Sequence, residues 1–521
     1  MKIIRRALIS VFDKSDLLDL VQILAENGVE FLSTGQTAKH LTQSGFQVRE
    51  VSDYTGFPEI LDGRVKTLHP RIYGGLLAVL DNPEHVEQTA AHGIESIDLI
   101  VSNLYPFEAT VQREGIELDE AIENIDIGGP TLIRAAAKNY QDVAVVTNPC
   151  QYPEIVEELR ENGGGLSSET RFRLAKAAFN HITRYDAAIS HYLSTLDDPG
   201  PEFPEVLNLR YEKAQELRYG ENPHQKAAFY RTVTSPEPCA AWAEQLSGQP
   251  LSFNNILDLE AALEIVKDFE DPTCAIIKHN NPCGLATGKD LVQAFNEALE
   301  CDRTSAFGSI IGVNRKVTIQ TANTIREAAK AGIKVEAIIA PSYTEQALKA
   351  LSRVKQRRIL ATGKLSLRPT VKQIRNVTGG LLLQDRDRRE IGPDELQVVS
   401  KREPTDAELE SLLFGWRACK HVKSNCILLA QGTKTVGIGA GQMSRVDSCI
   451  IAARKAGERA NGSVLASDAY FPFPDGIEIA GGAGVSAIIQ PGGSVNDQTV
   501  IDAANRYNMA MVLTGVRHFL H

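Results

Sequence analysis

The sequence predicts an α/β protein with more than one domain. Strand-like and helix-like patterns alternate along roughly the first 190 residues. A Pro-rich acidic segment then interrupts the chain at residues 196–204, and the triplet Ala-Ile-Ile recurs at residues 275–277, 337–339 and 487–489. The 521 residues exceed what a single hydrophobic core usually holds, so two to four domains are expected.

The N-terminal part shows the alternation in order. Short apolar runs followed by helical periodicity predict parallel strands joined by helices. Strands are expected at residues 7–12, 29–32, 98–101 and 143–147, and a helix at 15–27.

The acidic segment at residues 196–204 contains Asp-Asp-Pro-Gly-Pro and predicts a domain boundary. We therefore expect one domain over residues 1–199 and a second over residues 200–521. In the second part, apolar runs at 274–277 and 426–429 predict strands, and the three triplets suggest a duplicated α/β unit.

Composition excludes several classes of function. The 55 basic and 66 acidic residues give a formal charge of −11, which argues against nucleic acid as a partner. The eight cysteines include no CxxC pair, so neither a disulfide framework nor a metal site is expected, and a reducing, cytoplasmic location fits. No apolar run reaches the ~18 residues that a membrane span needs.

Two N-terminal segments carry groups suited to anion binding. Ser33-Thr34-Gly35-Gln36-Thr37 follows a predicted strand and opens a helix, which is typical of a phosphate cradle and also of an ordinary N-cap. Gly63-Arg64-Val65-Lys66-Thr67-Leu68-His69-Pro70 combines cations, a hydroxyl and an imidazole; its alternative interpretation is a solvated basic loop.

Two further segments lie at a predicted strand end and a predicted helix start. Asn103-Leu104-Tyr105-Pro106-Phe107 follows the strand at 98–101. Asp126-Ile127-Gly128-Gly129-Pro130 opens a helix carrying Arg134 and Lys138, where glycine N–H groups can face an anion or oxyanion.

In the C-terminal part, the most informative stretch is Ile276-Ile277-Lys278-His279-Asn280-Asn281-Pro282-Cys283-Gly284. We expect the strand to end in a turn marked by Asn-Asn-Pro. Lys278 can then stabilise a developing oxyanion, and His279 can act as a base near neutral pH. A surface lysine beside a capping histidine is the alternative.

Three other C-terminal segments resemble ligand-binding segments to different degrees. Arg218-Tyr219-Gly220-Glu221-Asn222-Pro223-His224-Gln225 offers a cation, an aromatic ring and an amide. Tyr470-Phe471-Pro472-Phe473-Pro474-Asp475 suits a flat heteroaromatic ring, or is a hydrophobic loop packed on the core. Gly437-Ile438-Gly439-Ala440-Gly441-Gln442 fails as a dinucleotide fingerprint because the third glycine is missing.

The blocks at 63–70, 126–139, 218–225 and 278–284, in this order, resemble the bifunctional purine-biosynthesis enzymes across essentially the whole chain. That family joins an inosine monophosphate (IMP) cyclohydrolase to a 5-aminoimidazole-4-carboxamide ribonucleotide (AICAR) formyltransferase. The resemblance implies a methylglyoxal-synthase-like N-terminal domain and two cytidine-deaminase-like C-terminal subdomains, which agrees with the suspected duplication.

The resemblance also implies the reactions. AICAR would take a formyl group from the co-substrate 10-formyltetrahydrofolate, and the product FAICAR would close to IMP with loss of water. It implies a homodimer whose formyltransferase sites use residues of both chains, and no obligatory metal.

The family pattern implies catalytic roles for seven residues. In formyl transfer, His279 would be the base, Lys278 would stabilise the oxyanion or the leaving group, and Asn425 would orient His279. In ring closure, Lys66 would polarise the formyl oxygen and Lys138 would transfer a proton. Tyr105 and Asp126 would position the amide.

The same pattern implies a set of nucleotide and folate contacts. In the N-terminal domain they are Ser10, Lys14, Ser33, Thr34, Gly35, Thr37, Arg64, Thr67, Ser102 and Asn103. In the C-terminal domain they are Arg218, Tyr219, Gly308, Glu336, Arg445, Tyr470, Asp475, Ser494, Val495 and Arg517.

Three residues depart from that pattern: Tyr470 stands where phenylalanine is expected, Glu336 where aspartate is usual, and Phe12 where some relatives have a small polar residue. Two alternative functions are a nucleotide-sensing regulatory module and a base deaminase. The Lys66–Lys138 pair argues against mere sensing, and the zinc ligands of deaminases are missing.

Overall fold

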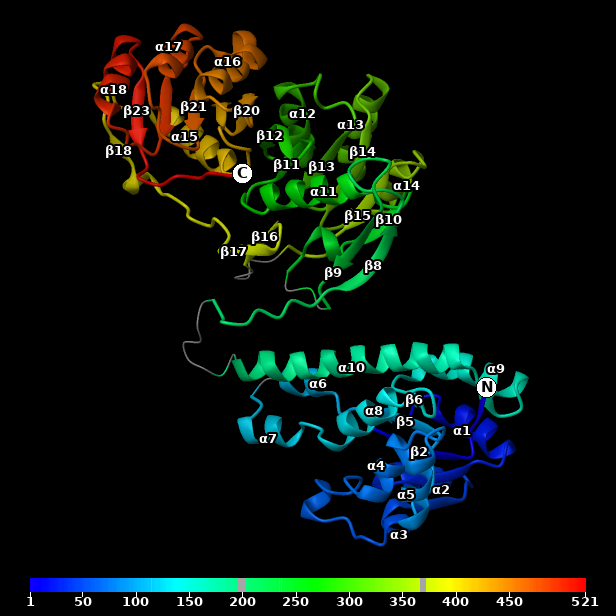
Figure 1. The fold of residues 1–521 in the computed structure, drawn as a ribbon. Helices are drawn as coiled ribbons and strands as arrows, with labels where there is room; N and C mark the ends of the chain where they lie inside the picture. The colour runs from blue at the N-terminus through cyan, green and yellow to red at the C-terminus, as the bar shows by residue number, and fades with distance from the viewer. Residues whose placement is uncertain (114, 195, 197–202, 234, 236, 366–371) are drawn as a thin grey trace. The chain divides into compact units, whose positions relative to one another are not determined.

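The chain divides into two compact units, Met1–Leu209 and Arg210–His521, in a computed structural model (Figure 1). The structure describes residues 1–113, 115–194, 196, 203–233, 235, 237–365 and 372–521. Each unit has its own main sheet and its own hydrophobic clusters. The predicted boundary between residues 199 and 200 lies outside the described residues.

The N-terminal unit contains a five-stranded parallel sheet in the order β4-β3-β2-β5-β6. Its strands are β2 (Arg6–Val11), β3 (Glu30–Ser33), β4 (Val48–Glu50), β5 (Leu99–Asn103) and β6 (Ala144–Val146). A short antiparallel pair, β1 (Lys2–Ile3) with β7 (Gly165–Leu166), lies outside it. Because the five strands are parallel, their carboxyl ends meet at one edge.

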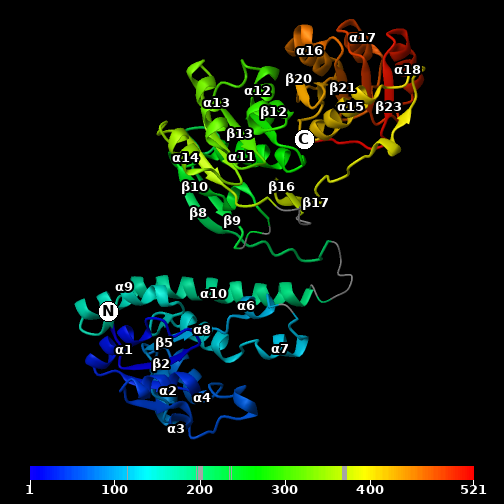
Figure 2. The same ribbon diagram turned by 180° about the vertical axis from the view of Figure 1, so that it is seen from behind.

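Helices cover both faces of this sheet, as Figure 2 also shows. On one face, α1 and α9 pack on alternate strand residues; Leu17, Leu20 and Leu24 recur at the helical period and are fully buried. On the other face lie α4, α8 and the long α10. The helices are α1 (Leu17–Glu26), α2 (Gly35–Gln43), α3 (Val51–Thr55), η1 (Leu61–Gly63), α4 (Pro70–Leu77), α5 (Pro83–Ala91), α6 (Phe107–Val111), α7 (Leu118–Glu123), α8 (Gly128–Lys138), η2 (Pro149–Gln151), α9 (Tyr152–Glu161) and α10 (Ser168–Ser194).

The C-terminal unit is built on a twelve-stranded mixed sheet in the order β10-β15-β14-β13-β11-β12-β20-β19-β21-β22-β23-β18. Two separate ribbons, β8–β9 and β16–β17, accompany it. The strands are β8 (Glu212–Leu217), β9 (Ala227–Arg231), β10 (Glu244–Ser247), β11 (Thr273–Lys278), β12 (Asn281–Thr287), β13 (Ser309–Val313), β14 (Val335–Ala340), β15 (Arg358–Ala361), β16 (Gln373–Val377), β17 (Gly380–Gln384), β18 (Gln397–Val398), β19 (Ile427–Gln431), β20 (Lys434–Gly439), β21 (Val464–Ser467), β22 (Ala487–Gln490) and β23 (Ala510–Leu513).

This sheet is an internal duplication. In the first half, β11 and β12 form a hairpin, β13 runs antiparallel to β11, and β14 and β15 continue parallel to β13. Strands β19 to β23 repeat this pairing, and the halves join where β12 meets β20. The predicted duplication is confirmed, with one correction: triplets 337–339 and 487–489 lie on equivalent strands, but 275–277 lies on β11, whose counterpart is β19.

Helices again form layers on both faces. Helices α11 and α15 share a hydrophobic cluster that spans both halves on one face. On the other face, α12 to α14 cover the first half and α16 to α18 cover the second. The helices are η3 (Ala240–Trp242), α11 (Phe253–Val266), α12 (Leu291–Cys301), α13 (Ile319–Lys330), α14 (Glu345–Leu351), η4 (Pro393–Glu395), α15 (Asp406–Cys419), α16 (Arg445–Ala456), η5 (Gly457–Ala460), α17 (Asp475–Gly482) and α18 (Asp497–Arg506).

The α/β class is confirmed, and each strand predicted above occurs within one or two residues of its expected bounds. The Asn-Asn-Pro-Cys-Gly segment was wrongly expected to be a turn. Asn281–Thr287 is the return strand β12, and the turn consists of His279 and Asn280. Among the described helices, none is both long and apolar enough to cross a membrane.

Candidate active sites

The carboxyl edge of the N-terminal sheet brings several predicted ligands together, although some of their side chains have structural partners. Asn103 Oδ1 accepts the N–H groups of Phe12 (2.7 Å) and Asp13 (2.9 Å), which fixes the loop after β2. Ser33 Oγ donates to Ile9 O (2.7 Å), and Thr37 Oγ1 donates to Val11 O (3.0 Å). These three side chains shape the edge.

The start of α2 is the part of this edge best suited to an anion. Thr34 is the extended N-cap residue, and its side chain makes no capping hydrogen bond. Gly35 follows with a φ of 50°, a conformation that glycine adopts most readily. The uncapped first turn leaves backbone N–H groups and the positive end of the helix dipole available at the edge. Ser10 and Ser102 lie on the neighbouring strands β2 and β5.

A second group of predicted residues gathers at the start of α8. Asp126 Oδ1 accepts the N–H of Gly129 at 2.9 Å. Burial raises the pKa of this carboxyl, while that hydrogen bond and the charge of Lys66 oppose the rise. Thr67 is buried here, and a Cβ on Gly128 would lie 3.1 Å from its Oγ1. Lys66, Thr67 and Asp126 are therefore brought together.

Three further predicted residues lie on the exposed rim. Arg64 forms an ion pair with Glu123, and this hydrogen-bonded carboxylate raises the pKa of the guanidinium. Tyr105 packs against Phe12, with ring centroids 5.4 Å apart. Lys14 Nζ donates to Phe12 O at 3.3 Å. The unusual Phe12 thus supports Tyr105.

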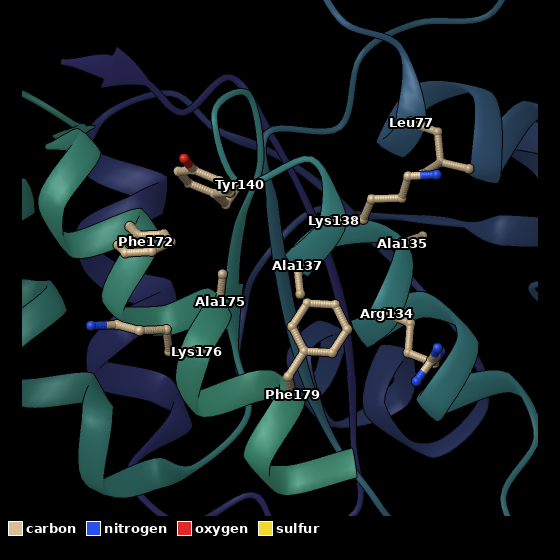
Figure 3. A pocket seen from close by; sticks show the side chains of 10 residues that line it. All are labelled: Leu77, Arg134, Ala135, Ala137, Lys138, Tyr140, Phe172, Ala175, Lys176 and Phe179. Atoms are coloured by element: carbon tan, nitrogen blue, oxygen red, sulfur yellow. The ribbon is translucent and has the colours of Figure 1, made fainter. Parts of the chain in front are cut away.

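Lys138 is not brought to the Lys66 group. It lies at the last residue of α8, and the rise of about 1.5 Å per residue separates it from Gly128 by about 15 Å. Its side chain lines a cavity of about 550 Å³ between α8 and α10, together with Arg134 and Phe179 (Figure 3). The expected Lys66–Lys138 pair does not form within one chain of this structure.

In the C-terminal unit, the hairpin turn after β11 presents Lys278 and His279. Lys278 Nζ donates to the carbonyl oxygens of Phe307 (3.0 Å) and Gly308 (3.4 Å), just ahead of β13. His279 and Asn280 both have positive φ angles, 54° and 60°. Two adjacent left-handed residues are typical of a tight two-residue hairpin turn.

More predicted residues lie beside this turn. A Cβ on Gly308 would lie 3.1 Å from Lys278 Nζ and 3.8 Å from Glu336 Oε1. The Arg218 guanidinium lies 5.2 Å from the ring centroid of Tyr219, and both residues interact electrostatically with Arg358, as does Glu336. The first half therefore supplies a compact mixed-charge group.

The second half supplies a buried network around Arg445. Its guanidinium donates to Asp468 Oδ1 (2.5 Å), Ser467 Oγ (2.8 Å) and Asn425 Oδ1 (2.9 Å). Asp468 is fully buried and also accepts from Ser424 Oγ at 2.6 Å. Sequence reasoning missed Asp468, although an acidic residue after a buried strand could have indicated it.

The two groups meet at one sheet edge, because Lys423 N donates to Asn281 Oδ1 at 2.9 Å across the junction of the halves. Asn425 is not hydrogen-bonded to His279 in the described contacts. Its amide nitrogen donates to Gln442 O and Met443 O, and its oxygen accepts from Arg445. Its expected orienting contact is absent from this structure.

The remaining predicted residues lie around the second half. Tyr470 and Val495 are exposed, whereas Phe471 is buried, so only part of the aromatic segment is available to a ligand. Ser494 Oγ accepts the N–H of Asn496 at 3.1 Å. Asp475 begins α17, and the Arg517 guanidinium lies 4.3 Å from the ring centroid of Phe519.

Comparison with known proteins identifies the family of this chain. The model of the "AICARFT/IMPCHase bienzyme" family matches residues 136–455, and that of the "MGS-like domain" matches residues 16–131. The chain is 51% identical to the "Bifunctional purine biosynthesis protein PurH" of Magnetococcus marinus over 534 residues, 99% of each chain. It is also 32% identical to the solved structure "Crystal structure of ForH", with a TM-score of 0.34, over 36% of this chain and 96% of that chain.

The chain belongs to the AICARFT/IMPCHase bienzyme family. It is therefore a bifunctional enzyme of purine biosynthesis that carries formyltransferase and cyclohydrolase activities, and its N-terminal domain is methylglyoxal-synthase-like. This membership excludes the regulatory module and the base deaminase as the main function.

Proposed function

We propose that the C-terminal unit transfers the formyl group of 10-formyltetrahydrofolate to AICAR and that the N-terminal unit closes FAICAR to IMP. The observation that carries the division is the geometry of the two polar edges. One combines a lysine and a histidine on a single turn, and the other combines an uncapped helix start with a lysine–carboxylate pair.

Formyl transfer needs a base and an electrophile, because the 5-amino group of AICAR is a weak nucleophile. The amine nitrogen bonds to the formyl carbon while His279 takes the amine proton. The bond from that carbon to N10 of the folate then breaks, and N10 leaves with the proton that His279 returns. Lys278 stabilises the negative charge on the formyl oxygen before N10 leaves. Arg445, Arg218 and Tyr219 hold the nucleotide.

Ring closure needs mainly orientation, since both reacting groups lie on one molecule. Lys66 polarises the formyl oxygen, and Asp126 positions the amide nitrogen that attacks the formyl carbon, with Tyr105 beside them. The former formyl oxygen then leaves as water. The start of α2 binds the phosphate. Lys138 takes part in proton transfer. In a homodimer, the partner's Lys138 would be the one that reaches the Lys66 group.

The assembly we propose is a homodimer in the cytoplasm. All eight cysteines are free, in agreement with a reducing compartment. Two-fold dimers are the commonest soluble assembly. A mixture of a His279→Ala chain with a chain changed at a residue that the partner contributes should regain formyl transfer if sites are shared. Sedimentation of a fully active monomer would exclude shared sites.

The decisive test of the function is incubation of the protein with AICAR and 10-formyltetrahydrofolate. Both tetrahydrofolate and IMP should form, and supplied FAICAR alone should give IMP. Release of tetrahydrofolate without IMP would refute the proposed cyclohydrolase site. Failure to release tetrahydrofolate would refute the proposed transferase site.

A further inference from the structure

Asp258 lies on α11, directly beneath the turn that carries His279, and it belongs to none of the predicted motifs. Its Oδ1 accepts the backbone N–H of Asn280 at 2.6 Å. With its amide nitrogen turned toward α11, the Asn280 side chain also donates to Asp258 Oδ1, at 3.0 Å, and to Leu257 O. One carboxylate thus binds this turn through both backbone and side chain.

The turn needs such a partner. L-residues with a Cβ disfavour the left-handed backbone region, yet His279 and Asn280 both adopt it. Asparagine tolerates this region better than histidine does. The hydrogen bonds to Asp258 offset part of the cost of this conformation and so help to hold the turn in place.

The surroundings of Asp258 act on its charge in both directions. Burial raises the pKa of this carboxyl, while the Asn280 and His279 N–H groups and the positive charges of His279 and Lys278 oppose the rise. Among the described contacts, the charged groups nearest the turn are Asp258 on α11 and Lys278 on β11, with Glu336 on β14 beyond Gly308. Lys423 contacts Asn281 through its backbone N–H, and its ammonium group donates to His521 O instead.

We propose that Asp258 is a positioning residue for formyl transfer, which holds the Lys278–Asn281 turn in place and favours the imidazolium formed when His279 accepts the proton. This inference rests on the proposed base role of His279. The carboxylate does not touch the reacting atoms; it acts on them through the histidine, as a negative charge beside an imidazole stabilises its protonated form.

Asp258→Asn tests the charge, because it keeps an acceptor oxygen of the same size. We expect kcat for formyl transfer to fall at least tenfold, with KM for AICAR and for the folate within about twofold. The acid limb of the pH–kcat profile should move to lower pH, since an imidazole without the nearby charge is protonated only at lower pH. Asp258→Glu should retain the wild-type limb.

Asp271→Asn is the matched control, because Asp271 is exposed and lies at the other end of β11. It should leave rate and pH profile unchanged. In the double variant Asp258→Asn/His279→Ala, transfer should be no slower than in His279→Ala alone, because both changes act through one group.

Several outcomes separate this inference from the proposed function. An active His279→Ala enzyme would refute the base role itself. An inactive His279→Ala with a near-normal Asp258→Asn enzyme would overturn only the role of Asp258. A fall in kcat with an unmoved acid limb, or unfolding of both Asp258→Asn and Asp258→Glu in a thermal scan, would show a purely structural contact and overturn the proposal.

Discussion

In the first half of the C-terminal sheet, the hairpin turn after β11 carries Lys278 and His279. In the second half, the equivalent turn after β19 carries Gln431 and Gly432, and Gly432 takes the left-handed position with a φ of 54°. A glycine adopts that conformation without strain. The strained form of the turn is therefore found in the half where its side chains have a proposed catalytic task.

Other equivalent positions have kept their structure. After β15, the N–H of Gly363 donates to Pro341 O (3.1 Å), and after β23 the N–H of Gly515 donates to Pro491 O (3.0 Å). The backbone framework is thus repeated with nearly the same hydrogen bonds. What differs is the polar side chains that each copy adds.

The two copies also contribute opposite strand ends to the proposed transferase edge. The first half contributes the β11–β12 turn and the starts of β13 and β14, whereas the second contributes the segment ahead of β19 and the end of β21. The reverse combination lies at the other edge, beside a cavity of about 1370 Å³. Duplication followed by divergence explains why only one edge carries the lysine–histidine turn.

The largest expected effect comes from substituting alanine for single residues of the two hairpin turns. His279→Ala should slow formyl transfer by on the order of 10²–10⁴, because the proposed catalytic base is lost. The equivalent change in the second half, Gly432→Ala, should leave the rate unchanged, because Gly432 holds the place of His279 in its own hairpin. Both rates are measured as tetrahydrofolate release. Similar losses in the two variants would contradict the asymmetry of the halves.

The unduplicated N-terminal unit provides an independent reference. Lys66→Met should slow closure of supplied FAICAR by about 10²-fold, since it removes the charge that we propose stabilises the reacting oxygen. Formyl transfer should persist, so FAICAR should accumulate when AICAR and the folate are supplied. A wild-type rate of IMP formation would show that Lys66 is only part of a basic loop.

Two glycines test whether the halves are packed alike. A Cβ on Gly284 would lie 1.8 Å from Ala298 O, and one on Gly437 would lie 2.2 Å from Ala452 O, where an equivalent helix crosses each hairpin. Gly284→Ala and Gly437→Ala should each destabilise the unit by roughly 1–3 kcal/mol. Gly392→Ala, with no atom within 4 Å of the added Cβ, should cost far less. Thermal unfolding measures all three, and a tolerated Gly437→Ala would contradict equivalent packing.

The smallest expected effect concerns the N-terminal caps of α11 and α15, the helices that pack on the same face of the two halves. Ser252 and Asn255 cap α11, whereas Thr405 and Glu408 cap α15. Partial burial alone would raise the pKa of the Glu408 carboxyl. The hydrogen bonds that Glu408 accepts from Arg402 and Thr405 outweigh this and lower the pKa to about 2 from 4.5. A carboxyl group whose pKa is lowered in the folded protein stabilises the fold when the pH is above the pKa of the same group in the unfolded chain. This stabilisation is lost as the pH falls from 4.5 toward 2.

Glu408→Gln should therefore lower Tm at neutral pH, and the difference from wild type should shrink between pH 5 and pH 2. Asn255→Ala should lower Tm by an amount that does not depend on pH in this range, because an amide does not titrate. A constant difference for Glu408→Gln would show that its charge does not contribute.

Much of the fold could be predicted from local patterns. Apolar runs such as residues 274–277 and 426–429 became buried strands because each is long enough to span the core. The duplication was visible only faintly, since two of three triplets fell on equivalent strands. The return strand Asn281–Thr287 was missed because Asn-Asn-Pro usually marks a turn.

The candidate sites were less predictable, since they depend on contacts between distant segments. Lys66 and Asp126 are brought together by tertiary packing, while Lys138 is carried away by the length of α8. Asp258 has no local signal, because its partner lies 22 residues away in the chain, whereas the only local sign of Asp468 is its place after a buried strand. The roles of the predicted ligands remain predictions.

The junction between β12 and β20 has a consequence for motion. Only Ala286 and Lys434 are paired in register there; Thr287 N donates to Thr433 O, and the Thr435 hydroxyl bridges the N–H and carbonyl of Leu285. A ladder completed by a side chain is easier to open than a full run of main-chain bonds. In hydrogen–deuterium exchange, the amides of Leu285 and Thr287 should lose protection together, before those in the middle of β11 or β19, so that each half behaves as a separate cooperative unit.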